Sequence, residues 1–278
     1  YYKQKVCFSA ANYKLAPNVN LENVRHQLLC LNPVVDNILD YMTGPIPEYH
    51  ALKREDKINK ALNIGLPIVW MYVGLESGVL VNYPGSGTLS EGYDPRLRPW
   101  YSAALKKEDT AWSSPYVDAF GAGVVMSASR KLFDNEGRLL GVSSVDMTFS
   151  HITKLMKSEG PRDIFVIRKY IIDTEGNVLL GSSLKDDQVK KAEKDFSTIK
   201  FEHFPYPQIS SHISKHEAGQ FEVKSDSKEI LICYAPVPTM GWYYVEEVDL
   251  GKLLSSLDLI LAGNKEISDL PHSPTKDN

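Results

Sequence analysis

Hydrophobic residues recur at near-helical spacing near the start of the chain. Over Leu21–Leu62 they lie mostly three or four positions apart, which is typical of a helix with one apolar face. Asn20 is well placed to cap the start of this helix. Pro33 predicts a bend or a break. The stretch "TGPIP" then separates a second expected helical segment, Glu48–Asn63.

After Pro67 the pattern changes to short β-rich runs joined by turns. The first hairpin is expected to turn at Glu76–Gly78, and two more at Asp134–Gly137 and Asp173–Gly176. In each of these turns the glycine supplies the positive φ that a tight connection between strands needs. A last set of strands over 219–249 is expected to turn at Asp226–Ser227.

The two D-x-E-G hairpins lie in different halves of the chain, which predicts two copies of a related unit. An apparent helix over 149–160 joins them, and the boundary is expected near 159–163. The predicted fold class is α+β, with antiparallel sheets flanked by helices. The expected organisation is a helical segment, two β-rich modules and a polar tail, at 1–63, 64–160, 161–262 and 263–278.

Composition excludes some classes of protein. The 278 residues carry 31 basic and 35 acidic side chains, a formal net charge of −4, and no basic run, so nucleic acid is not an expected partner. No apolar run is long enough to span a bilayer. Without an initiator Met or a signal peptide, the sequence is interpreted as a mature or excised fragment whose membrane anchor could have been removed. Its three cysteines have no metal-type spacing and are interpreted as incidental thiols.

The stretch "YDPRLRPWYSAA", 93–104, concentrates polar and aromatic side chains between two prolines. Pro95 and Pro99 predict a stiff, extended loop that leads into a helix. Arg98 offers a planar fork that suits a carboxylate. Tyr93 and Trp100 are hydrogen-bond donors whose aromatic bodies can wall a small pocket.

Acidic residues follow downstream. "SSPYVDAF" contains Tyr116 and Asp118, and the apolar strand "LLGVSSVDM" ends near Asp146. A buried carboxylate needs a cation or several donors. One guanidinium, several donors and two carboxylates complement an α-amino acid zwitterion. Alternatively, Arg98 pairs with one of the aspartates as scaffolding, and spacing alone slightly favours that interpretation.

Three stretches together strongly resemble the double Cache sensor family: "YDPRLRPWYSAA", "YVDA" and "GRLLGVSSVDM". Members are extracytoplasmic ligand-binding domains of chemoreceptors, sensor histidine kinases and cyclic-dinucleotide enzymes, and accessory subunits of animal calcium channels. The resemblance covers Leu21–Leu254. It implies a long N-terminal helix followed by two PAS-like modules, of which the first, membrane-distal one binds the ligand.

One subgroup of this family binds amino acids, and the chain matches its motif. The resemblance implies these ligand-binding residues: Tyr93, Arg98, Trp100, Tyr101, Tyr116, Asp118 and Asp146. The first three would hold the ligand carboxylate. Tyr101 and the two aspartates would surround the ammonium, with Tyr116 in the same wall. Trp70 and Tyr72 on the opposite wall would select the ligand's side chain.

The resemblance also implies a role without catalysis. The partner would be an α-amino acid, with no cofactor, in a domain outside the cytoplasm of a membrane-anchored receptor. The whole protein could carry a histidine kinase or cyclic-dinucleotide output domain and dimerise through its N-terminal helix. The alternatives are another ligand (organic acid, amine or purine), a non-signalling ectodomain, and a hydrolase, for which no nucleophile–base pair is found. Zinc at His212 and His216 is a minority interpretation, so no metal site is predicted.

Overall fold

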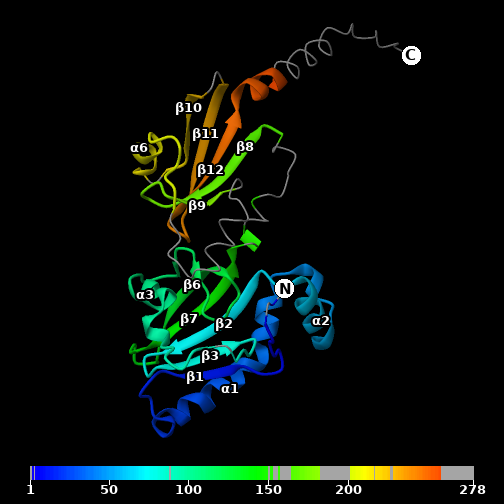
Figure 1. The fold of residues 1–278 in the computed structure, drawn as a ribbon, viewed down its shortest axis with the longest axis vertical. Helices are drawn as coiled ribbons and strands as arrows, with labels where there is room; N and C mark the ends of the chain where they lie inside the picture. Colours follow the sequence, from blue (N-terminus) through cyan, green and yellow to red (C-terminus); the bar gives the residue numbers. More distant parts are fainter. Residues whose placement is uncertain are drawn as a thin grey trace, which may run out of the picture. The chain divides into compact units, whose positions relative to one another are not determined.

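The computed structural model describes residues 2, 4–87, 89–149, 151–152, 156, 164–181, 201–215, 217–225 and 228–257, with only the backbone described at 32–36. The chain forms two compact units, each built on an antiparallel sheet (Figure 1). The predicted α+β class with two sheets is therefore confirmed. The expected domain boundary near 159–163, the turn at Asp226–Ser227 and the polar tail lie outside the described residues.

The N-terminal part differs from expectation in three places. A short strand that the pattern did not predict, β1 (Asn12–Leu15), precedes the long helix α1 (Leu21–Thr43). Asn20 caps α1 as predicted, since its side chain accepts a hydrogen bond from the Glu22 amide at 2.9 Å. The helix runs on past Pro33 without ending, because a proline removes only one helical hydrogen bond and packing supports the turns beyond it.

The second expected helix is split in two. A 3₁₀ turn, η1 (Pro47–Tyr49), is followed by helix α2 (Arg54–Ile64). Tyr49 is buried, and it packs with Ala61 of α2 in the cluster that covers one face of the first sheet. This burial favours a break that turns Tyr49 inward over a continuous helix.

The first sheet has seven strands. Besides β1 they are β2 (Ile68–Leu75), β3 (Val79–Tyr83), β4 (Ala111–Trp112), β5 (Tyr116–Val117), β6 (Val124–Phe133) and β7 (Leu139–Thr148). The order is β1-β3-β2-β7-β6-β4, with β5 also paired to β6 (Figure 1). The predicted hairpin turns are present, with Gly78 and Gly137 at φ values of 84° and 79°.

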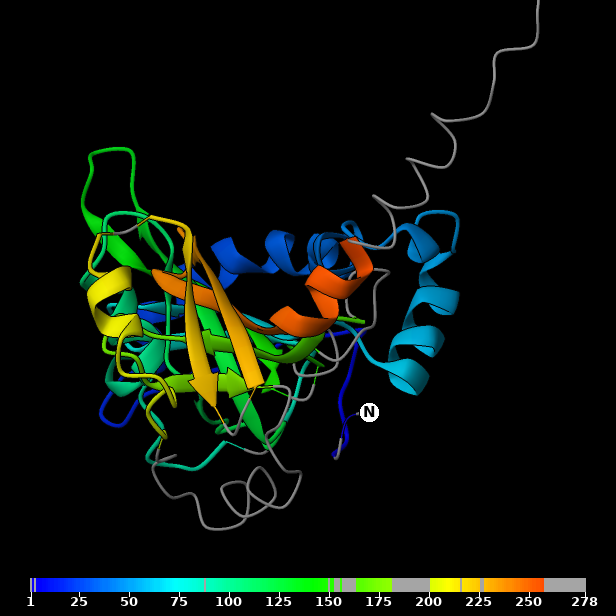
Figure 2. The same ribbon diagram turned by 90° about the horizontal axis from the view of Figure 1, so that it is seen from above.

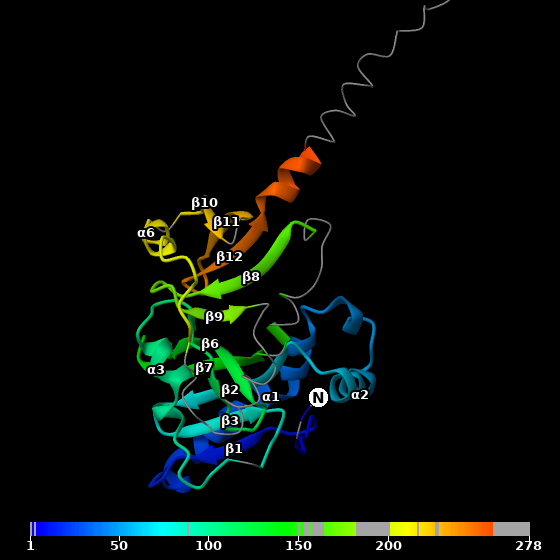
Figure 3. The same cartoon turned by 45° about the horizontal axis from the view of Figure 1, so that its top comes forward.

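The second sheet has five strands. They are β8 (Val166–Ile172), β9 (Val178–Gly181), β10 (Gly219–Ser225), β11 (Lys228–Val237) and β12 (Trp242–Asp249). Their order is β10-β11-β12-β8-β9, and Figure 3 shows β12, β8 and β9 side by side. The short helix α6 (Ile209–Ile213) packs its two isoleucines in the core of this sheet. Figure 2 shows the helix, in yellow, beside the strands.

The two sheets share one topology once β1 is set aside and the short strands β4 and β5, which both pair with β6, are counted as one. In each unit the first strand lies between the second and the fifth, and the fifth is followed by the fourth and the third. The first strands are β2 and β8, and the fifth strands are β7 and β12. This common order supports an internal repeat. The two D-x-E-G turns that suggested it are not equivalent, because Asp134–Gly137 joins the fourth and fifth strands of its unit and Asp173–Gly176 joins the first and second.

The first sheet presents two different faces. On one, Leu39 and Met42 of α1 pack with Tyr83. On the other, Trp70 and Tyr72 of β2 pack with Trp100 of helix α3 (Pro99–Leu105). Alternate residues of β2 thus face α1 or α3, as the two-residue period of a strand requires. The second face carries the candidate site.

Within the described part of the chain, none of the helices is both long and apolar enough to cross a bilayer.

Candidate ligand-binding site

The loop that carries Arg98 is rigid, though it is not extended throughout. Asp94 and Arg98, which precede the two prolines, are extended as predicted, with ψ angles of 118° and 150°. Between them, η2 (Pro95–Leu97) forms a 3₁₀ turn capped by the Asp94 side chain. Arg96 pairs with Asp94 at 2.6 Å and donates to the carbonyl of Glu76 at 3.2 Å. Arg96 therefore braces the loop against the first hairpin.

Asp118 is a buried carboxylate held by three N–H donors. Its Oδ1 accepts from the backbone amide of Phe120 at 3.0 Å. Its Oδ2 accepts from the amide of Ala122 and from the Trp70 indole, both at 2.8 Å. The turn after β5 therefore curls around its own aspartate, and β2 supplies the third donor. This set satisfies most of the acceptor capacity of an ionised carboxylate.

Asp146 on β7 is only 1% exposed, and its two carboxylate oxygens have different numbers of hydrogen-bond donors. Its Oδ1 accepts from the Tyr72 hydroxyl at 2.5 Å and from the Ser127 hydroxyl at 2.6 Å. Its Oδ2 is buried and has no hydrogen-bond partner among the described residues. An ionised oxygen buried without a donor is costly. The site thus lacks a donor at one defined atom.

The environment shifts the ionisation of both carboxyl groups. Burial raises the pKa of Asp146 well above its ordinary value, and the nearby charge of Asp118 raises it further. Hydrogen bonds from Ser127 and Tyr72 oppose this rise in pKa, as does the charge of Arg98. Burial also raises the pKa of Asp118, although its N–H donors counteract the shift. The pair favours a shared proton or an added cation.

Arg98 is half-buried and lies beside two tyrosines. The guanidinium carbon is 5.7 Å from the centre of the Tyr93 ring and 5.9 Å from that of Tyr116. Within the described ranges, no carboxylate oxygen lies within the 4.0 Å of an ion pair to Arg98. Neither Asp118 nor Asp146 is therefore its direct partner, and the scaffolding interpretation finds no support.

Aromatic side chains connect these groups. Phe120 is central, with ring centres 5.2 Å from Trp70 and 6.1 Å from both Tyr72 and Tyr93. The Tyr72 ring stands edge-on to Trp100 at 4.8 Å. Trp70 and Tyr72, expected only to select a ligand side chain, thus also donate hydrogen bonds to the two aspartates.

The charged groups that act on Tyr101 differ from those around Asp118 and Asp146. Its ring packs on Trp100 at 5.4 Å, and its hydroxyl is buried without a hydrogen-bond partner in the described part of the chain. Burial raises the pKa of Tyr101, as does the charge of Glu76, whereas Arg96 lowers it. None of the contacts described for Tyr101 involves Asp118 or Asp146. Tyr101 nonetheless belongs to the same buried cluster as Tyr93 and Trp100, so all seven residues of the predicted motif lie together.

Sequence reasoning missed two members of this cluster. Ser127 links three groups, since its hydroxyl donates to Asp146 and lies 2.7 Å from the hydroxyl of Tyr116 and 3.3 Å from that of Tyr72. Phe120 provides both an aromatic wall and a backbone donor. The one available signal for Ser127 was a polar side chain in an otherwise buried strand.

Other candidate chemistry does not form a site. Among the described residues no group of three or more histidine, cysteine or acidic side chains could hold a metal. His212 stacks on Phe221 at 4.5 Å, and His216 lies outside the described residues. Cys7, Cys30 and Cys233 are free thiols.

The chain is similar in sequence to curated chemotaxis proteins. It is 29% identical over 192 residues to the methyl-accepting chemotaxis protein McpA of Pseudomonas putida, covering 68% of this chain and 27% of McpA. It is 25% identical over 230 residues to McpC of Bacillus subtilis, covering 82% of this chain and 31% of McpC. The chain thus spans less than a third of either relative.

The fold matches a solved ligand-binding domain. The chemoreceptor CtaA of Pseudomonas fluorescens, solved with L-isoleucine, aligns with a TM-score of 0.53 and 22% identity, covering 86% of this chain and all of that one. The Cache domain model matches residues 21–257, which is most of the chain. The resemblance noted in the sequence is confirmed: the chain belongs to the Cache domain family.

Proposed function

We propose that the chain is the extracytoplasmic sensor domain of a transmembrane signalling receptor, and that its first unit binds an α-amino acid. The observation that carries this proposal is the bare Oδ2 of Asp146, buried beside a second carboxylate. A ligand ammonium supplies hydrogen-bond donors and positive charge at once. The chain offers no such group at that atom among the described residues.

The other end of the ligand is assigned to Arg98. Its guanidinium has no carboxylate partner in the described ranges and stands between the Tyr93 and Tyr116 rings. Arg98 is close enough to Asp146 for its charge to lower the pKa of that carboxyl group. One cation and one incompletely satisfied anion in a common cluster favour a zwitterion over a simple acid or amine. The wall of Trp70, Tyr72 and Phe120 would surround the rest of the ligand.

Comparisons with known proteins support the ligand class. CtaA, which shares the fold, was solved with L-isoleucine and with L-leucine, and the sequence relatives are chemotaxis receptors. We propose no chemistry for this domain. The membrane anchor, the output domain and a dimer through the N-terminal helix belong to the proposed whole receptor. Its mechanism would be a difference in ligand affinity between two conformations.

The test is calorimetric titration of the twenty proteinogenic L-amino acids, tried singly. Each binder is compared with its decarboxylated amine and its deaminated acid, and only the zwitterion should bind tightly. Arg98→Ala should weaken binding by about 2 kcal/mol, or roughly thirtyfold. Arg130→Ala is the matched control, because Arg130 lies on the same unit with an exposed side chain.

Two results would contradict the proposal in different ways. Unchanged binding after replacement of both Arg98 and Asp146 by alanine would place the ligand elsewhere. Binding of a dicarboxylate, an amine or a purine, with failure of every amino acid, would keep the fold and replace the ligand class.

A further inference from the structure

Residues 2 and 4–8, here called the N-terminal strap, lie against the candidate site although the family match begins only at residue 21. The strap has no helical or strand periodicity, and the sequence patterns assigned it no role. Tyr2 and Val6 nonetheless pack against the cluster that contains Trp70, Tyr93 and Phe120. The strap is therefore close enough to act on the site.

Tyr2 contacts the strand that carries the indole donor. Its hydroxyl donates to the carbonyl of Val69 at 3.3 Å, and its ring lies 5.6 Å from that of Trp70. Trp70 is fully buried and donates to Asp118. Tyr2 thus packs against Trp70, which is one of the three donors to Asp118.

Gln4 contacts the turn that carries the other two donors. Its side-chain Nε2 donates to the carbonyl of Phe120. Its carboxamide also lies over Gly121, where an added Cβ would meet the carboxamide atoms at 3.9 Å. The amides of Phe120 and Ala122 on either side of that glycine both hold Asp118. All three donors to Asp118 are therefore carried by residues that the strap touches or adjoins.

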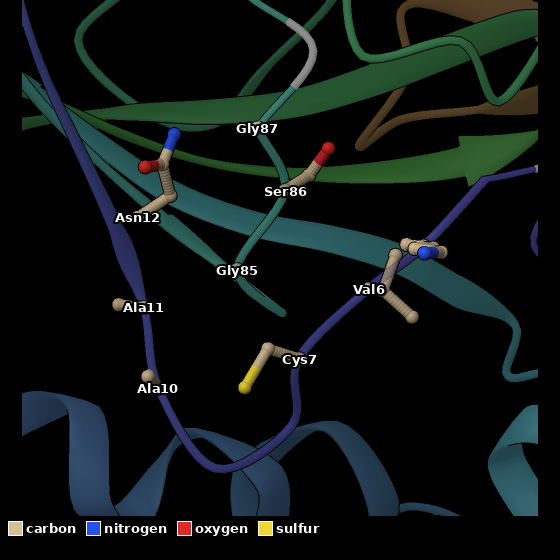
Figure 4. A pocket seen from close by; sticks show the side chains of 9 residues that line it. Val6, Cys7, Ala10, Ala11, Asn12, Gly85, Ser86 and Gly87 are labelled. Atoms are coloured by element: carbon tan, nitrogen blue, oxygen red, sulfur yellow. The ribbon is translucent and has the colours of Figure 1, made fainter.

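The strap is anchored independently of that turn. The backbones of Cys7 and Gly85 exchange two hydrogen bonds of 2.8 Å, and the Tyr83 hydroxyl donates to the carbonyl of Phe8 at 2.7 Å. Figure 4 shows this region, where a hollow of about 330 Å³ is lined by Val6, Cys7, residues 10–12 and residues 85–87. Losing the contact at Gln4 should therefore leave the strap attached to the sheet.

We propose that Tyr2 and Gln4 are positioning residues of the ligand site, which hold the three N–H donors of Asp118 at the geometry needed to keep that carboxylate ionised beside the ligand ammonium. The strap is then a working part of the sensor outside the family-matched region. This inference rests on the proposed amino-acid site. It goes beyond that site by adding a segment that touches no ligand.

The test uses Gln4→Met, which keeps an unbranched side chain of similar length and removes the donor. Tyr2→Phe removes only the hydroxyl at the second contact, and Ser9→Ala is the control at an exposed position next to the strap. The probe is the tightest binder among the twenty proteinogenic L-amino acids. Gln4→Met should weaken its binding roughly five- to tenfold, as expected for loss of one buried hydrogen bond.

Two further readouts separate positioning from general stability. Gln4→Met should lose affinity more steeply than wild type towards acid pH, below the step set by Asp146, because weaker N–H bonds raise the pKa of Asp118. It should also speed hydrogen exchange at the amides of Phe120 and Ala122 by roughly tenfold, measured by NMR without ligand. Ser9→Ala should change none of these.

The outcomes distinguish the inference from the proposed function. Suppose that the wild-type protein binds an amino acid. If Gln4→Met then leaves both the Kd and the pH dependence of binding unchanged, the inference is overturned, even if the melting temperature falls. Unchanged exchange at Phe120 and Ala122 would overturn it regardless of ligand. Failure of the wild-type chain to bind any amino acid would instead overturn the proposed function.

Discussion

The two units bury an acid at the same place in their common topology and treat it differently. Asp146 on β7 is the register partner of Trp70 on β2, and Glu247 on β12 is the register partner of Arg168 on β8. Two residues further along each first strand a tyrosine donates its hydroxyl to the acid: Tyr72 to Asp146 at 2.5 Å and Tyr170 to Glu247 at 2.8 Å. The repeat thus extends to individual side chains.

The difference lies in the cation. In the second unit Arg168 approaches the free oxygen of Glu247 at 3.9 Å, so the chain supplies the positive charge itself. In the first unit the equivalent position is Trp70, which donates to Asp118 and leaves Oδ2 of Asp146 bare. Glu247, whose charge is balanced by Arg168, can serve a purely structural role. Asp146 has no such partner, and its position suits a cation that comes from outside the chain.

The largest expected effect is at the open site. Asp146→Asn should weaken amino-acid binding by about 3 kcal/mol, or more than a hundredfold, because it removes the charge that faces the ammonium. Without ligand, the variant should be at least as stable as wild type at neutral pH. The folded-state pKa of Asp146 is raised, so its ionisation opposes folding once pH exceeds the unfolded value. Calorimetry and thermal unfolding measure the two effects, and lower stability without ligand would contradict this account.

Glu247→Ala should show the opposite pattern in the second unit. It leaves the buried Tyr170 hydroxyl without its acceptor and opens a small cavity, which should cost about 2 kcal/mol of folding stability. Ligand affinity should stay within twofold of wild type. Denaturant unfolding and calorimetry together check this, and an affinity loss comparable to that of Asp146→Asn would erase the proposed contrast.

A pair of glycines tests how tightly each unit is packed. A Cβ at Gly74 would lie 2.7 Å from the ring of Trp100 and 2.9 Å from Pro95, both buried, so Gly74→Ala should destabilise by about 1–3 kcal/mol and weaken binding. At Gly219 the added Cβ would meet the hydroxyl end of the Tyr234 side chain at 2.3 Å, and Tyr234, which is 9% exposed, is less enclosed than Trp100, which is 1% exposed. Gly219→Ala should therefore cost less. Equal losses of stability in the two variants would show that Trp100 makes room for an added Cβ as easily as Tyr234 does.

The pH profile is the finest test. Asp146 must lose its proton to receive an ammonium, so affinity should rise with pH up to the raised pKa of Asp146 and level off above it. Below that pKa the slope should be roughly tenfold per pH unit. The groups that face Asp146 are Tyr72, Tyr116, Asp118 and Arg98, and burial raises the pKa of both tyrosines, so neither competes for the proton. An affinity independent of pH throughout the acidic range would contradict the assignment.

Much of this arrangement could be predicted from local patterns. The hairpin turns follow from glycines next to acidic or polar residues, and the bracing role of Arg96 follows from its place on a proline-fixed loop. The family motif named seven residues, and the structure brings them together, with Tyr101 making no described contact to either aspartate. Each of these signals is contained within a few neighbouring positions.

What could not be predicted depends on register and on contacts distant in sequence. Ser127 matters because β6 and β7 align it with Asp146, and a one-residue slip would turn it to the other face. The equivalence of Trp70 and Arg168 likewise appears only once both sheets are paired. Gln4 reaches Phe120 across more than a hundred positions without any periodic pattern to announce it.

Strand β1 has a practical consequence. It pairs with β3 over four residues, and all five residues of β3 are buried. A fragment cut at residue 21, where the family match begins, would uncover the backbone hydrogen-bonding groups of a hydrophobic edge strand. Such an edge invites pairing between molecules, so the shortened domain should self-associate and precipitate where the longer one stays dispersed. The boundary that suits sequence comparison is therefore a poor one for preparing the protein.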